Sequence, residues 1–133
     1  MKHSLLTLIV VAFGLALTTT HAADKLGDWK RLGQKEVDGK VDRDEISVGA
    51  DEGSFRSIKL EVLKEDVEFI SVRVVFTNGA DQEIELKDKI RAGGETRAID
   101  LDGRNRSIRK VVFVFRSDGR GRRSGIVVLH GRR

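Results

Sequence analysis

The sequence contains no cysteine, no proline and no tyrosine, and it contains a single tryptophan, Trp29. Without cysteine the protein forms no disulfide, no thiolate metal site and no catalytic thiolate. The fold therefore has to rest on a buried apolar core. A chain of this length can supply one, because disulfides or metals become necessary only below about 40 residues.

Long hydrophobic runs are also missing, apart from residues 5–17 near the N-terminus. This run of about 13 residues is too short to span a bilayer, which takes about 20. Lys2 precedes it and small or polar residues follow it, which is the pattern of a secretory signal peptide. We therefore expect residues 1–22 to be a signal peptide. Residues 23–133 are expected to form one periplasmic or secreted domain, with no transmembrane segment after cleavage.

Catalytic side chains are scarce as well. Cleavage would remove His3 and His21, which leaves His130 as the only imidazole. His130 directly follows an apolar run, a position typical of a surface histidine at a strand end. No serine lies in a recognisable nucleophile setting, which needs a positioned base and an orienting group. Two carboxylates could share acid and base roles, but the sequence does not show two of them converging, so we expect a protein that is not an enzyme and needs no cofactor.

Apolar and polar residues alternate through most of the remaining chain, as in half-buried strands. The alternation is clearest in residues 58–62 and 70–76. Further strands are expected at residues 29–32, 45–49, 84–86, 99–101, 111–115 and 126–129. No segment keeps a 3.6-residue period, so helix is limited to a turn or two. We expect an all-β fold of seven to eight strands, an antiparallel β-sandwich that is jelly-roll-like.

Turn residues fall between these expected strands. Asn78 and Gly79 give the strongest hairpin signal, because both central residues of the favoured two-residue turn need positive φ. Asp-Gly pairs at residues 102–103 and 118–119 mark further reversals. Residues 24–42, apart from a short strand near the tryptophan, are expected to be irregular.

The formal charge of +4 is unevenly distributed. Residues 24–100 carry 14 basic and 19 acidic side chains, whereas residues 101–133 carry 10 basic and 2 acidic ones. A segment of charge +8 therefore follows a body of charge −5. Arginine dominates the basic segment, and its planar fork suits phosphate, sulfate and carboxylate. The candidate anion-binding residues are Arg104, Arg106, Arg116, Arg120, Arg122, Arg123, Arg132 and Arg133.

Two interpretations of these arginines stay open. They could bind an anionic polymer or envelope surface, such as lipopolysaccharide or an acidic glycan. Nucleic acid is disfavoured, because the loops lack the aromatic side chains on which bases stack. Alternatively, the arginines solubilise a hairpin tip or pair with the acidic strand at residues 82–88. If the strands flanking residues 116–125 pair as a hairpin, the loop arginines lie at one end and the other four at the opposite end.

Asp38, Asp42 and Asp44 are candidate calcium ligands, since calcium takes about six to eight oxygen ligands. Their spacing differs from the calcium loop of alternate acidic residues, and Lys40 and Arg43 lie among them. A loop with local Asp–Arg pairs is the simpler interpretation. A calcium-assisted carbohydrate-binding module is nevertheless the second functional hypothesis.

In the run at residues 111–115 both the odd-numbered and the even-numbered positions are apolar, so both faces of the strand would be apolar. Either it is a central strand covered on both faces, or Val112 and Val114, together with Val75, form an outer patch for a partner. The first alternative predicts a monomer. The second predicts a weak dimer or an envelope protein-interaction factor.

Several sequence features recur together in one family. They are the Asn78-Gly79 pair, the sequence IDLDG at residues 99–103, the closing Gly131-Arg-Arg, and Trp29-x-x-Leu-Gly near the start. In these features, which run through most of the chain, it resembles a family of small exported bacterial β-sandwich proteins of unknown function. The resemblance implies an exported β-sandwich and offers no known activity, cofactor or catalytic residue.

Overall fold

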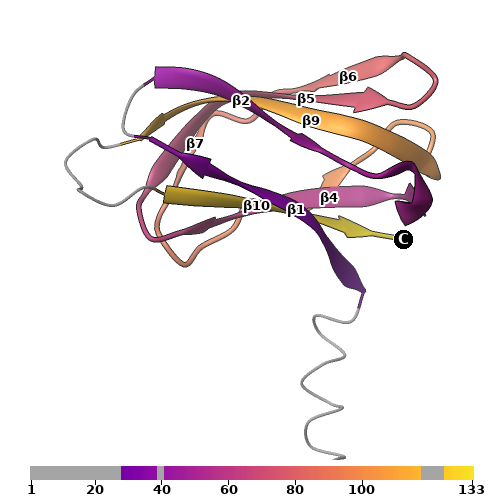
Figure 1. The fold of residues 1–133 in the computed structure, drawn as a ribbon. Coiled ribbons are helices and arrows are strands. Elements are labelled where there is room, and N and C mark those ends of the chain that lie inside the picture. The colour runs from indigo at the N-terminus through magenta and orange to yellow at the C-terminus, as the bar shows by residue number, and fades with distance from the viewer. Residues whose placement is uncertain (1–27, 39–40, 118–124) are drawn as a thin grey trace, which may run out of the picture.

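The computed structural model describes residues 28–38, 41–117 and 125–133, in which the chain is almost entirely β-strand (Figure 1). The strands are β1 (Trp29–Val37), β2 (Val41–Ser47), β3 (Ser54–Phe55), β4 (Ser57–Leu63), β5 (Val67–Phe76), β6 (Asp81–Ile84), β7 (Asp88–Ile90), β8 (Ile99–Asp100), β9 (Arg106–Ser117) and β10 (Gly125–Arg132). One short 3-10 turn, Ala50–Glu52, is the only helical element in these ranges. The expected signal peptide lies outside the described residues.

The strands form two antiparallel sheets that lie face to face (Figure 1). Sheet A has the order β1-β10-β4-β8, and sheet B has the order β2-β9-β5-β6, with β3 added to β9 and β7 added to β5. Apart from the additions β3 and β7, the strands follow the jelly-roll order of two interleaved Greek keys. The predicted antiparallel, jelly-roll-like sandwich is confirmed, and the strands beyond the expected eight are very short. Where the chain is described, no helix is long and apolar enough to cross a membrane.

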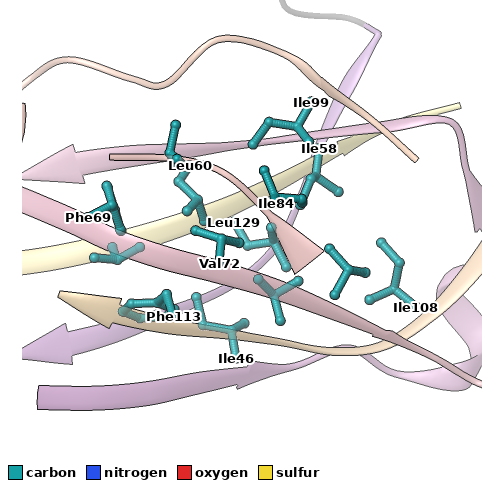
Figure 2. Packing of buried hydrophobic residues seen from close by; sticks show 14 of the residues in the cluster. Ile46, Ile58, Leu60, Phe69, Val72, Ile84, Ile99, Ile108, Phe113 and Leu129 are labelled. Atoms are coloured by element: carbon teal, nitrogen blue, oxygen red, sulfur yellow. The ribbon is translucent and has the colours of Figure 1, made fainter. Parts of the chain in front are cut away.

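The core fills the space between the sheets (Figure 2). Leu60 of β4 and Leu129 of β10 point inward from sheet A, and Val72 of β5 and Phe113 of β9 point inward from sheet B. The rings of Phe69 and Phe113 meet edge to face, with centroids 6.0 Å apart. This arrangement follows from the alternation in the sequence, because every second residue of a strand faces the same side.

β9 and β10 do not pair with each other, which corrects the expected hairpin at residues 116–125. β9 lies between β2 and β5 in sheet B, whereas β10 lies between β1 and β4 in sheet A. Phe113 and Leu129 therefore approach the core from opposite sheets (Figure 2). Two strands that are neighbours in one sheet cannot face each other across a core in this way, so the chain crosses between the sheets.

The expectation of an irregular segment at residues 24–42 is also wrong over its second half. Residues from Trp29 to Val37 form β1, which pairs along β10. The register shifts between Arg31 and Gly33, which marks a bulge. A bulge places one extra residue in the strand and breaks the period-2 pattern. The sequence of β1 therefore does not show the alternation of apolar and polar residues that marks the other strands.

The turn at Asn78 differs from the expected one in its backbone. Gly79 has φ 92°, but Asn78 is not among the residues with positive φ. The amide of Gly79 donates to the Phe76 carbonyl at 3.0 Å, and the amide of Ala80 donates to the Asn78 side chain at 3.0 Å. The connection is therefore a longer loop that ends in one left-handed glycine, in which only that residue needs positive φ.

Val112 lies on the outer face of sheet B but is only 6% exposed. It pairs laterally with Glu45 of β2 and Arg73 of β5, and residues paired in this way share a face. Long charged side chains cover neighbouring apolar surface with their methylene stems. Val114 and Val75 are half-buried. The outer apolar stripe exists, but its most central residue is already covered within the chain.

Gly131 marks the tightest approach of β10 to its neighbours. A Cβ atom there would lie 2.8 Å from Leu32 Cδ1 and 2.8 Å from Phe55 Cδ1. We expect Gly131→Ala to lower the free energy of unfolding by about 1–3 kcal/mol, because overpacking forces buried neighbours to move. Gly125→Ala in the same strand is the matched control, since its nearest contact would be 3.3 Å. Urea denaturation measures both variants, and equal losses would contradict this account of Gly131.

Candidate functional site

The outer face of sheet A brings together side chains from three strands. Trp29 of β1 pairs with Arg132 of β10, and Arg31 pairs with His130 in the next row of the same face. His130 in turn pairs with Lys59 of β4. The residues that alternate with them, such as Leu129, point into the core. The register of β10 between its two neighbours therefore assembles this cluster.

These side chains surround a hollow of about 260 Å³. Its lining consists of Trp29, Arg31, Lys59, Glu61, Glu95 and His130, and we call it the Trp29 hollow. Glu95 belongs to the segment between β7 and β8. It lies beside β4, where it forms an isolated bridge with Glu61. The hollow thus combines one aromatic surface with both hydrogen-bond donors and carboxylate acceptors, a composition suited to a polar ligand with an apolar face.

One ion pair and one histidine–carboxylate contact position the polar groups of the Trp29 hollow. Lys59 Nζ lies 3.1 Å from Glu95 Oε1, and His130 Nε2 lies 2.9 Å from Glu61 Oε1. Lys59 is only 8% exposed although it projects from the outer face. Each carboxylate is therefore already held by a neighbouring side chain, Glu95 by Lys59 and Glu61 by the His130 imidazole, which sets the positions of the polar groups around the hollow.

Trp29 lies against two cations that project from the sheet. Its ring centroid is 4.4 Å from Lys59 Nζ and 4.6 Å from Arg132 Cζ, which are cation–π distances. The Nε atom of Arg132 is buried and has no hydrogen-bond partner in the described part of the chain. The contacts with Lys59 and Arg132 hold the indole against sheet A.

The sequence-based view of His130 changes at this point. His130 lies inside β10, not beyond its end, and its side chain is part of the Trp29 hollow. The lone tryptophan and the lone histidine of the described chain meet there. Their rarity was the available signal, but they are about 100 residues apart in sequence, and only the strand register shows that they are neighbours.

The candidate arginines fall into three groups. Arg120, Arg122 and Arg123 lie outside the described residues. Arg116 at the far end of β9 pairs with Glu68 at 3.6 Å, so its charge is already opposed by a carboxylate. Among the described residues, Glu83 of the acidic strand pairs with Arg73 and not with a C-terminal arginine.

The remaining four candidate arginines lie near the opposite end of the sandwich. Arg106 pairs with Phe55 of β3, and the Arg133 guanidinium lies 5.1 Å from the centroid of the Phe55 ring. The carbonyl of Arg132 accepts from the amide of Arg56 at 2.7 Å. Arg104 belongs to the loop before β9. The expectation that these four share one end agrees with the structure, although the hairpin from which it was argued does not exist.

A second hollow of about 580 Å³ lies at this end. It is lined by Arg56, Asp100, Leu101, Asp102, Gly103 and Arg104, and we call it the Arg104 hollow. Gly103 and Arg104 have φ of 83° and 61°. A left-handed conformation is unusual for an arginine, and it sets the turn that carries this side chain to the rim.

The three candidate calcium ligands are not brought together. Asp44 Oδ1 lies 3.6 Å from Lys35 Nζ, and Asp42 Oδ1 accepts from the amide of Arg43 at 2.7 Å. The carbonyl of Asp38 accepts from the Ser117 hydroxyl at 3.0 Å. Within the described ranges, no group of three or more histidine or acidic residues is placed to hold a metal ion.

Comparison with known proteins gives a family and weak structural likenesses. A family model described as a domain of unknown function (DUF2541) matches residues 5–131, which confirms the resemblance to an uncharacterised family. No curated protein matches the sequence.

The solved structures that are similar to this chain include AlgX of Pseudomonas aeruginosa, with TM-score 0.49 and 9% identity over 78% of this chain and 26% of AlgX. The chain thus spans about a quarter of AlgX. The SPBc2 prophage-derived protein YomS has TM-score 0.42 and 16% identity over 78% of this chain and 92% of YomS. A family 29 carbohydrate-binding module complexed with cellulohexaose has TM-score 0.35 and 15% identity over 78% and 80%. At TM-scores below 0.5 these likenesses say nothing about a ligand.

Calcium is expected to leave the melting temperature unchanged. A ligand that binds only the folded state raises stability in proportion to RT ln(1 + [L]/Kd), and Asp42 and Asp44 are already engaged by an amide and a lysine. Thermal unfolding with millimolar calcium, compared with magnesium and with chelator, measures the effect. A calcium-specific rise that disappears in Asp42→Asn would restore the calcium hypothesis.

Two ion pairs with the same 3.1 Å separation allow a test of how burial changes the coupling energy of an ion pair. Lys59 pairs with Glu95 beside the Trp29 hollow, and the lysine side chain is 10% exposed. Arg73 pairs with Glu83 on sheet B, and both side chains are at least half exposed. Double-mutant cycles to alanine are expected to give a coupling energy of about 1 kcal/mol or more for the first pair and a few tenths for the second, since exposed pairs contribute little. Equal couplings would show that the hollow does not shield its charges.

Proposed function

The chain belongs to the family of the domain of unknown function DUF2541, and we propose that it is an exported, non-catalytic binding domain whose ligand is an acidic glycan held in the Trp29 hollow. The observation that carries the proposal is the position of the only tryptophan, in a hollow otherwise lined by arginine, lysine, histidine and two glutamates. Export rests on the signal-peptide pattern of residues 1–22.

A sugar ring has the two kinds of surface that the Trp29 hollow offers. Its C–H face is apolar and packs against the electron-rich face of an indole. Its hydroxyl groups both donate and accept hydrogen bonds. Glu61 and Glu95 can accept such bonds, and Lys59 can donate them. A purely apolar ligand would displace water from these charged groups and offer them no hydrogen bonds in return, which is costly.

The charge balance of the hollow favours an acidic sugar over a neutral one. Glu95 is paired with Lys59, and Glu61 lies within hydrogen-bond distance of His130 Nε2. Arg31 and Arg132 have no carboxylate partner among the residues that the structure describes. A guanidinium offers two parallel donors to carboxylate or sulfate. An acid group on the sugar would supply the missing counter-charge.

A binding role rather than a catalytic one is proposed for the same side chains. Glu61 and Glu95 are the carboxylates of the hollow, and each is already engaged by a neighbouring side chain, Glu95 by Lys59 and Glu61 by His130. The ligand is therefore expected to be released unchanged after incubation with the protein.

The proposal describes a monomer. Val112 on the outer face of sheet B is covered by its neighbours within the chain, which leaves little apolar area for self-association. Polar and charged side chains surround the half-buried Val75 and Val114.

Binding can be followed through Trp29 itself, because it is the only tryptophan. Titration with polygalacturonate, heparin or lipopolysaccharide is expected to change the fluorescence of Trp29, whereas neutral cellulose-derived oligosaccharides have a weaker effect. Raising the salt concentration should weaken binding of the acidic glycans, because salt screens charge. By calorimetry, Trp29→Ala is expected to reduce the affinity at least about tenfold, as for a buried aromatic anchor.

The loop arginines provide the matched comparison. Arg120, Arg122 and Arg123 carry the second candidate for anion binding, and their replacement by serine should leave binding in the Trp29 hollow intact. Arg116→Ser, which removes an arginine that already has a carboxylate partner, shows the effect of losing one positive charge from the same segment. Binding that survives Trp29→Ala but is lost when the loop arginines are replaced would overturn the proposal in favour of the loop.

A further inference from the structure

One row of laterally paired residues joins the two hollows. Trp29 of β1 pairs with Arg132 of β10, Arg132 pairs with Ser57 of β4, and Ser57 pairs with Asp100 of β8. The row thus crosses all four strands of sheet A on a single face. Trp29 lines one hollow and Asp100 lines the other. The hollows lie at opposite ends of one row.

The row sets the span between the hollows. Neighbouring strands lie about 4.8 Å apart, so three steps place the two ends roughly 14 Å from each other. The Ser57 hydroxyl donates to Asp100 Oδ1 at 2.9 Å, which shows that these two side chains share a face. Ser57 is buried. A ligand would therefore bridge the ends of the row and would not touch its middle, so it has to be longer than one sugar.

The Arg104 hollow has the same mixture of donors and acceptors as the Trp29 hollow. Arg104 has no carboxylate partner within 28–38, 41–117 and 125–133, and Arg56 Nη2 donates only one long hydrogen bond, of 3.4 Å, to the main-chain oxygen of Arg133. Asp100 and Asp102 line the same hollow. The guanidinium groups suit an acid group, and the carboxylates suit the hydroxyls of a sugar.

We infer that the ligand is an acidic oligosaccharide that lies across the strands of sheet A, with one sugar on Trp29 and an acid group further along the chain held by Arg56 and Arg104. This inference rests on the proposed function of the Trp29 hollow and adds the length and direction of the ligand. Arg132 lies between the two ends of the row and would contribute positive charge along the path.

A length series with a double variant tests the inference. The wild-type protein is titrated with galacturonate, with oligogalacturonates of increasing length and with heparin-derived oligosaccharides of increasing length. Affinity is expected to rise with length until the chain covers about 14 Å and then to level off. Arg56→Ser with Arg104→Ser should weaken binding of the long oligomers about tenfold or more, because two charge-assisted contacts are lost.

The short ligands distinguish a failure of the inference about Arg56 and Arg104 from a failure of the proposed function of the Trp29 hollow. The double variant should bind them as the wild type does, which also shows that it is folded. Arg43→Ser with Arg116→Ser, which changes the net charge equally on sheet B, should leave the long oligomers unaffected. A double variant at Arg56 and Arg104 that binds long oligomers like the wild type, or affinity that does not depend on length, would overturn the inference alone. Binding of every oligomer that is unchanged by Trp29→Ala, or no binding of either series, would overturn the proposed function with it.

Discussion

The position of β10 between β1 and β4 is the constraint on which the rest of the molecule depends. Its inward residues, such as Leu129, join the core, and Gly131 lets Phe55 and Leu32 approach the strand closely. Its outward residues, His130 and Arg132, lie between Trp29 and Lys59. A shift of the register by one residue would exchange the two faces, so the same pairing that builds the core also builds the Trp29 hollow.

The outer faces of the two sheets differ in how their charges are used. On sheet B, Glu45, Glu68 and Glu83 each pair with a basic residue of a neighbouring strand, which leaves a self-neutralised surface. On sheet A, an indole lies over Lys59 and Arg132, and Arg56 and Arg104 line the hollow at the other end of the same row. This asymmetry is the physical reason to place a ligand on sheet A.

Because β9 and β10 lie in different sheets, the described arginines of the basic segment do not gather on one hairpin. A hairpin would have placed its arginines on the edges of two paired strands. In the jelly roll these strands belong to opposite sheets, so Arg106 lies beside Phe55 and Arg132 lies beneath the tryptophan. An arginine-rich sequence is thereby divided among a loop, a hollow and cation–π contacts, and its net charge alone does not identify a binding surface.

The sequence by itself determined the fold class, the approximate strands and the core, because alternation of apolar residues is a local property of each segment. It also identified Trp29 as the single tryptophan and His130 as the single histidine left after signal cleavage, but it placed Trp29 in a short strand within an otherwise irregular segment and His130 at a strand end. Only the tertiary structure decided that they are neighbours, that a bulge lies after Arg31 and that β9 and β10 cross between sheets. Strand order and register depend on contacts between segments far apart in the chain, and those contacts are set by packing of the whole core rather than by any local pattern.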